Sequence, residues 1–171
     1  MASGIIYGST SNKYITGRIV WSSTTDINNN TSTVSATLSY YKDSSYSNRT
    51  YSSTFEGSIT INGSTKTIHK YDHDRIKLYR DVGWVVMDSY SVTVPHNTNG
   101  TKSIVISATG KMVETTFTST SLSETVVLDT IPRASIINSL SCSTSYFDGT
   151  LTYKYTPQSS SYYNRCNISL N

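Results

Sequence analysis

The stretch TVSATLSYY (residues 33–41) decides the fold class, because apolar and hydroxyl side chains alternate along it. The apolar parity holds Val34, Ala36, Leu38 and Tyr40. The opposite parity holds Ser35, Thr37, Ser39 and Tyr41. Successive side chains of a strand point to opposite faces of the sheet, so the stretch predicts a strand with one buried face. The two adjacent tyrosines cannot share a face, so one faces outward if the other is buried.

The segments upstream show the same kind of pattern. GIIYGS (4–9) predicts a short strand, and YITGRIVWSS (14–23) predicts a longer one. In the longer segment the bulky apolar residues share one parity: Ile15, Ile19 and Trp21. The polar run TTDINNNTS (24–32) is expected to form the turn into the next strand.

Asn-Gly dipeptides mark two turns further along the chain. Asn62-Gly63 separates two alternating runs and predicts a hairpin, since both residues tolerate positive φ. HNTNG (96–100) separates WVVMDSYSVTVP (84–95) from TKSIVISATGKM (101–112), and its Asn-Gly pair is expected to form a second tight hairpin turn.

The composition fits a chain made of strands. Among 171 residues there are 31 serines, 26 threonines and 14 tyrosines, whereas only 15% of the residues are charged. Threonine, tyrosine, valine and isoleucine suit a pleated, half-buried surface, and a disordered chain would carry more charge and fewer aromatic residues. With roughly eight to ten short strands, residues 1–130 predict an all-β, antiparallel sandwich of jelly-roll or immunoglobulin-like type. For one segment, YDHDRIKLYRDVGW (71–84), the pattern does not decide between a loop, a short helical turn and an edge strand.

The segment VVLDTIPRAS (126–135) predicts the end of this domain. Pro132 has no amide hydrogen for a central ladder, so residues 131–135 are expected to form a stiff, extended linker. The alternating pattern resumes at Ile136, and residues 136–171 predict part of a second immunoglobulin-like β domain. Because so few strands cannot close a sandwich, we expect this domain to be cut from a longer protein or to pair with something else. Its first strand or its last segment is then expected to pair with material beyond residue 171. The alternative is a small β-subdomain packed on the first domain.

Several classes of function are excluded by composition and spacing. The net charge of +3 is scattered, which argues against nucleic acid as a partner. No apolar run approaches the roughly 20 residues that cross a bilayer, so membrane insertion is not expected, and the start lacks the pattern of a secretory signal. Cys142 and Cys166 are too few for the usual zinc sets, and the three histidines form no zinc motif. We therefore expect no metal and no cofactor; whether the two cysteines pair stays open.

Four segments carry a resemblance to a known group of proteins. They are LDTIPRAS, VPHNTNGTKSIVISATG, WSSTTDINNNTSTVSATLSYY and TLTYKYTPQSSSYYNR. These segments resemble minor structural and tail proteins of long-tailed, siphovirus-type bacteriophages that infect Gram-positive bacteria. In that family a β-sandwich is followed by the Thr-Ile-Pro-Arg junction and then by immunoglobulin-like domains. Most of the chain is covered, and the junction and the hairpin segment are its most specific parts.

The resemblance implies a component of the virion tail, assembled in the host cytoplasm and located in the tail tip, fibre or baseplate. Its expected partners are other tail proteins and further copies of itself. Because first domains of this group are compared with carbohydrate-binding modules, a polysaccharide of the host surface is the expected ligand. A purely architectural tail module without a ligand is the main alternative, and a cell-wall-degrading enzyme is a third.

Exposed aromatic side chains with polar neighbours would form the glycan site, because a ring can stack on a sugar while hydroxyl and carboxylate groups bind its hydroxyls. The candidate residues are Tyr41, Tyr46, Tyr51, Tyr71, Asp72, Tyr79 and Trp84. Under the alternative, Trp21 and Trp84 are core residues and the tyrosines form cross-strand pairs. No catalytic residue is assigned and the chain is not expected to be an enzyme, because nothing singles out a pair among the following acids: Glu56, Asp72, Asp74, Asp88 and Glu114.

Overall fold

The structure is a computed structural model, and it confirms an all-β protein built on antiparallel sheets. It describes residues 1–43, 51–70, 76–78, 83–112, 117–133, 136–141 and 152–156. Within these ranges there is no helix. The first ten strands are β1 (Ser3–Ser9), β2 (Ile15–Asp26), β3 (Thr31–Lys42), β4 (Tyr51–Ser53), β5 (Phe55–Ile61), β6 (Ser64–Lys70), β7 (Ile76–Leu78), β8 (Val85–Pro95), β9 (Ser103–Met112) and β10 (Phe117–Val127).

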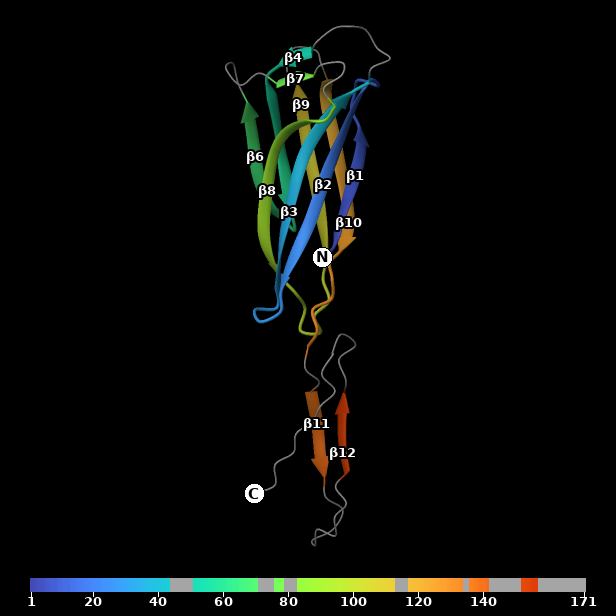
Figure 1. The fold of residues 1–171 in the computed structure, drawn as a ribbon, viewed down its shortest axis with the longest axis vertical. Coiled ribbons are helices and arrows are strands. Elements are labelled where there is room, and N and C mark those ends of the chain that lie inside the picture. Colours follow the sequence, from blue (N-terminus) through green and yellow to red (C-terminus); the bar gives the residue numbers. More distant parts are fainter. Residues whose placement is uncertain are drawn as a thin grey trace.

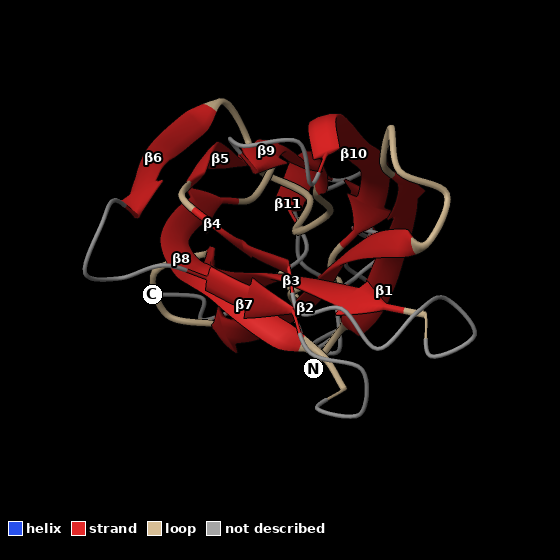
Figure 2. Ribbon diagram, turned by 90° about the horizontal axis from the view of Figure 1, so that it is seen from above, coloured by secondary structure: helices blue, strands red, loops and turns tan. Residues whose placement is uncertain are grey.

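Two four-stranded sheets face each other and form the predicted sandwich (Figures 1 and 2). Sheet A has the strand order β1-β2-β3-β8, and sheet B has the order β10-β9-β5-β6. The short strands β4 and β7 pair with each other at one end of the sandwich (Figure 1). The chain therefore enters sheet A at β8 from the short pair of β4 and β7, and it enters sheet B at β9 directly from sheet A.

The core lies between the sheets and consists of the apolar parity of each strand. In β3 the predicted set is confirmed, because all four members have no exposed surface: Val34, Ala36, Leu38 and Tyr40. Tyr41 points the other way and is partly exposed, as adjacency to a buried Tyr40 requires. Trp21 of β2 is buried, so its interpretation as a core residue is confirmed.

The first turn is shorter than the expected range of 24–32. The ladder between β2 and β3 continues to the pair Asp26 and Thr31, so only residues 27–30 lie outside it. Asp26 accepts hydrogen bonds from the backbone N–H and side-chain amide of Asn29, at 3.1 and 2.7 Å. These bonds hold the pKa of Asp26 below its usual range. Asn30 has positive φ, which asparagine tolerates better than most residues.

The two Asn-Gly turns differ. Asn62 and Gly63 have φ of 48° and 82° and join β5 to β6, so the predicted hairpin is confirmed. The expected hairpin at 96–100 is wrong, because β8 lies in sheet A and β9 lies in sheet B. Gly100 does have positive φ, but the segment crosses from one sheet to the other.

Contacts with residues beyond β10 explain this crossing. The Gly100 carbonyl accepts the N–H of Ile131 at 2.9 Å, and Ile131 is fully buried. The same carbonyl lies 2.8 Å from Nδ1 of the buried His96, which must donate because a carbonyl only accepts. The start of the expected linker 131–135 is therefore held by the turn at Gly100.

Beyond this junction, β11 (Ile136–Ser141) and β12 (Thr152–Thr156) form an antiparallel pair with an irregularity between Ile137 and Ser139. Both strands fall in segments where strands were predicted. Cys142 and Cys166 lie outside the described residues.

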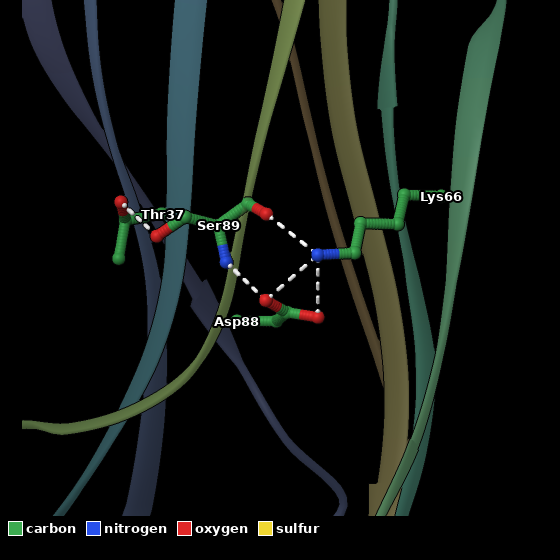
Figure 3. A network of polar contacts seen from close by, with 4 residues as sticks. All are labelled: Thr37, Lys66, Asp88 and Ser89. Carbon is green, nitrogen blue, oxygen red and sulfur yellow. Dashed lines mark hydrogen bonds and ion pairs between the residues drawn. The ribbon is translucent and has the colours of Figure 1, made fainter.

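The two open sides of the sandwich are joined differently. On the side of β1 and β10, Thr10 forms a bridge with Thr120, and the Ser11 N–H donates to the Ser119 carbonyl at 3.0 Å. On the side of β6 and β8 the link is made by side chains (Figure 3). There Lys66 Nζ contacts the carboxylate of Asp88 at 2.9 Å and donates to the Ser89 carbonyl at 3.0 Å.

The Lys66–Asp88 pair is expected to contribute little to stability. Desolvation opposes ionisation of Asp88, but hydrogen bonds from Lys66 and from the Ser89 N–H outweigh it and hold the pKa of the carboxyl below its usual range. Replacing Asp88 by asparagine should cost less than about 1 kcal/mol at neutral pH, because Lys66 is 39% exposed and water screens the pair.

This small contribution has a defined pH dependence. Because the folded pKa of Asp88 is depressed, the carboxylate stabilises the fold above the ordinary aspartate pKa of about 3.9, and the effect is lost as the pH falls through the folded value. Urea unfolding of wild type and Asp88→Asn should show a difference at neutral pH that shrinks in acid. An equal difference at both pH values would assign the loss to packing instead of charge.

Candidate aromatic binding surface

The outer face of sheet A carries the most unusual surface of the described chain. Across the four strands the ladder aligns Tyr7 of β1 with Arg18 of β2, Arg18 with Ser39 of β3, and Ser39 with Val86 of β8. These positions alternate with core residues along their strands, so they point away from the core. Tyr7 is 60% exposed and Val86 is 54% exposed, whereas most large apolar side chains are buried.

Three aromatic rings and a guanidinium meet around Trp84. The ring centroid of Trp84 lies 5.6 Å from that of Tyr41 and 6.1 Å from that of Tyr7, both in tilted arrangements. Cζ of Arg18 lies 4.0 Å from the Trp84 ring centroid, which is within the range of a cation–π contact. We call these four residues (Tyr7, Arg18, Tyr41 and Trp84) the aromatic platform.

A β-bulge explains why Trp84 joins this face. The ladder pairs Leu38 with Asp88 and then Ser39 with Val86, so Met87 is an extra residue in β8. An extra residue in one strand shifts the parity of everything beyond it. On the C-terminal side of the bulge the odd residues of β8 face outward, whereas on its N-terminal side the even residue Val86 is exposed, and Met87 itself is buried. Trp84 follows the shifted parity.

Hydroxyl groups cover the rest of this face. Three cross-strand pairs join β3 to β8 through their side-chain oxygens: Thr33–Thr93 at 3.3 Å, Ser35–Ser91 at 2.7 Å and Thr37–Ser89 at 2.8 Å. Figure 3 shows the last of these beside the Lys66–Asp88 contact. Exposed aliphatic side chains continue the row of Thr37 and Ser89 across β2 and β1, since Val20 (37% exposed) pairs with Thr37 and Ile5 (47% exposed) pairs with Val20. The face thus changes from hydroxyl to aromatic along the strands.

The structure brings together two of the predicted site residues, Tyr41 and Trp84. Trp84 is partly exposed, so it is not a core residue. Of Tyr51 only the backbone is described, in β4. The other predicted residues lie outside the described ranges: Tyr46, Tyr71, Asp72 and Tyr79.

Tyr7 and Arg18 were missed by the sequence analysis. The signal available for both was their parity, because each alternates with apolar residues that the pattern assigns to the core. Parity alone shows that a residue faces outward, but it does not show which strands are neighbours in the sheet.

A second surface feature is a shallow depression of about 420 Å³ on sheet B, which includes residues of β5, β6, β9 and β10. Its polar groups already have partners within the protein. Glu56 forms an ion pair with Lys111 at 2.7 Å, and Ser58 and Thr109 share a hydrogen bond at 2.9 Å. Nothing in the depression therefore calls for a ligand.

The other candidate chemistries find no support among the residues that the structure describes. Glu56 and Asp88 each pair with a lysine, whereas Asp72, Asp74 and Glu114 lie outside the described ranges. No group of three or more His, Cys, Asp or Glu side chains in the described part could hold a metal ion. That part also contains no helix with the length and hydropathy to cross a membrane.

Fold and surface together define a two-layer antiparallel β-sandwich with an aromatic platform on one sheet. Comparison of the chain with protein-family models, with curated proteins and with solved structures found no match. The residues of the platform are therefore the basis for a functional assignment, together with the resemblance noted from the sequence.

Proposed function

We propose that the chain is a component of a phage virion tail and binds a glycan of the host surface through the aromatic platform. The observation that carries this proposal is the position of Trp84 beside both Tyr7 and Tyr41 on the solvent side of sheet A. Aromatic rings offer a flat apolar surface for the C–H faces of a sugar, and the tyrosine hydroxyls add polar contacts.

The surroundings of the platform suit the same ligand. The serine and threonine pairs of β3 and β8 offer hydroxyl oxygens along the direction of the strands, where a polysaccharide could continue beyond the rings. Each hydroxyl group has two acceptor lone pairs, so a bond within a pair leaves capacity for another contact. A single site of this kind binds weakly, but many copies on one tail would raise the effective concentration and give firm attachment.

The assignment to a tail rests on the resemblance carried by the junction and turn segments. Two of these segments contain contacts that fix the fold at one end, since Gly100 lies in one and Ile131 in the other. Other tail proteins and further copies of the chain are the partners that this assignment implies. The assignment implies no catalytic step, and the two described candidate acids, Glu56 and Asp88, each form an ion pair with a lysine.

Binding to purified cell walls tests the proposal. A panel of walls from Gram-positive bacteria is incubated with the chain and with Trp84→Ala, and the bound fraction is measured over a range of concentrations. We expect at least one wall to retain the wild type, and the variant to lose about tenfold in affinity, which corresponds to a contact of about 1.4 kcal/mol.

Val105→Ala is the matched control for this experiment. Val105 is an exposed apolar residue of sheet B, so its truncation removes surface without touching the platform. Circular dichroism shows whether each variant is folded. Equal retention of Trp84→Ala, Val105→Ala and wild type would contradict the proposed site.

An architectural role is the second candidate, and the exposed aliphatic residues favour it. Ile5, Val20 and Val86 border the platform, and a contiguous apolar patch is also what a protein interface offers. If this face packs against another tail protein or another copy, no wall should retain the folded chain. Sedimentation would then show association that Val86→Ser weakens.

A further inference from the structure

Among the residues that the structure describes, Arg18 is a cation without an acidic partner, and it lies beside aromatic and aliphatic side chains. It lies in the middle of the outer face, where its guanidinium contacts the ring of Trp84. Its Nε is buried and has no hydrogen-bond partner. No protein group in the described part of the chain therefore binds Nε, and the described contact that positions the guanidinium is the one with the Trp84 ring.

On the described parts of β1, β2 and β3, the outward positions next to Arg18 carry no carboxylate. Its neighbours across the ladders are Tyr7 and Ser39, and the next row contains Ile5, Val20 and Thr37. The nearest outward acids on the described parts of β2 and β3 are Asp43, four positions beyond Ser39, and Asp26, eight positions beyond Arg18. At roughly 3.3 Å per residue these separations are about 13 and 26 Å, so neither acid neutralises the guanidinium by direct contact.

We propose that the platform selects an anionic saccharide, one that carries phosphate or carboxylate groups, and that Arg18 binds the anion. This inference rests on the proposed glycan-binding function and names the chemical class of its ligand. The rings of Tyr7, Tyr41 and Trp84 would bind the sugar, while the guanidinium beside them binds the charged substituent.

The geometry favours an anion over a neutral hydroxyl. A guanidinium presents its N–H groups in a plane, and this fork matches the two oxygens of a carboxylate or phosphate. The Trp84 ring holds the guanidinium in place, so less side-chain freedom is lost when the anion binds. Since Nε is covered, the anion would meet the two terminal nitrogens.

Two matched pairs of polymers distinguish the source of the charge. The first pair is a phosphorylated mannan and the same mannan after removal of its phosphate. The second pair is polygalacturonate and its carboxyl-reduced form. Binding of the full chain to each is measured by calorimetry at low and at physiological salt, with Arg18→Gln, Arg18→Lys, Trp84→Ala and Lys102→Gln as variants.

We expect wild type to bind at least one charged polymer about tenfold more tightly than its neutral counterpart, and the preference to fall with added salt. Arg18→Gln should abolish this preference, so that its affinities for the charged and the neutral member of a pair become equal within about twofold. Arg18→Lys should keep part of the preference, because it keeps the charge and loses the planar fork. Lys102→Gln removes one positive charge away from the platform and should change neither affinity.

The inference is wrong if wild type binds both members of each pair equally, or if Arg18→Gln keeps the preference. In either case, if Trp84→Ala loses binding, the proposal that the platform binds a glycan still holds. Absence of binding to all four polymers and to the wall panel would overturn both proposals. Equal losses in Arg18→Gln and Lys102→Gln would show a general effect of net charge and would also contradict the assignment to Arg18.

Discussion

Replacing Gly100 by alanine is expected to lower the free energy of unfolding by about 3 kcal/mol, the largest effect among the substitutions considered for this chain. Two costs add up at this position. Gly100 has φ of 81°, where a side chain is strained. A Cβ there would also lie 1.8 Å from the carbonyl oxygen of Ile131, so the backbone of the junction would have to move away.

Gly63→Ala separates the two costs. Gly63 has nearly the same φ, 82°, but a Cβ there meets no atom within 4 Å. The alanine at position 63 should therefore cost only the conformational strain, about 1–2 kcal/mol. Urea unfolding followed by tryptophan fluorescence gives both values. Equal losses in the two variants would show that the close approach of the Ile131 carbonyl adds no cost to a side chain at position 100.

Replacing Gly110 by alanine is expected to cost about 2 kcal/mol by overpacking the core. Gly110 lies opposite Gly57 in the ladder between β9 and β5, and the ring of Phe55 fills the space that these glycines leave. A Cβ on Gly110 would lie 2.6 Å from Cζ of Phe55 and 2.7 Å from the hydroxyl oxygen of Tyr40. Neither side chain has any exposed surface, so neither can move aside into solvent.

A second variant identifies the cause of this loss. Phe55→Leu alone should destabilise the fold, but combined with Gly110→Ala it should cost less than the sum of the two single changes, because the smaller side chain makes room for the methyl group. Thermal unfolding of the four proteins of this cycle gives the interaction energy. Strictly additive losses would mean that the ring of Phe55 is not what excludes a side chain at position 110.

Local sequence patterns predicted those parts of the fold that depend only on residues close together in the sequence. The alternation of residues 33–41 was sufficient to place Tyr40 in the core and Tyr41 outside, because strand parity is a property of the segment itself. The Asn62-Gly63 hairpin followed from two residues that tolerate positive φ. Both predictions needed no knowledge of distant contacts.

The Asn-Gly pair at 99–100 shows where local reasoning ends. It has the same residue types as the pair at 62–63, yet it leads from one sheet to the other. What differs is the bond between Gly100 and Ile131, which comes from a residue thirty-one positions later. The two turns also differ in backbone conformation, since Asn62 has positive φ and Asn99 does not. Contacts far along the chain therefore decide both the shape of such a turn and the strands that it joins.

The candidate site was only partly predictable for a similar reason. The sequence does not decide whether Trp84 lies in the core or on the surface, because the bulge at Met87 reverses the parity of β8. Nothing in the sequence marks that extra residue. Tyr7 and Arg18 come from β1 and β2, so their meeting with Trp84 depends on the order of four strands. Such an order is a property of the complete sheet.

The contact between the amino group of Met1 and the carboxylate of Asp129 has a consequence for engineering. The contact places the N-terminus of the chain beside the residues that follow β10, just before the junction (Figure 1). A domain whose ends adjoin tolerates circular permutation and insertion into a host loop. A short linker of glycine and serine residues would join residue 133 to residue 1 and keep the buried Ile131 in place. New ends opened at the Asn62-Gly63 turn would leave the platform undisturbed on the opposite sheet.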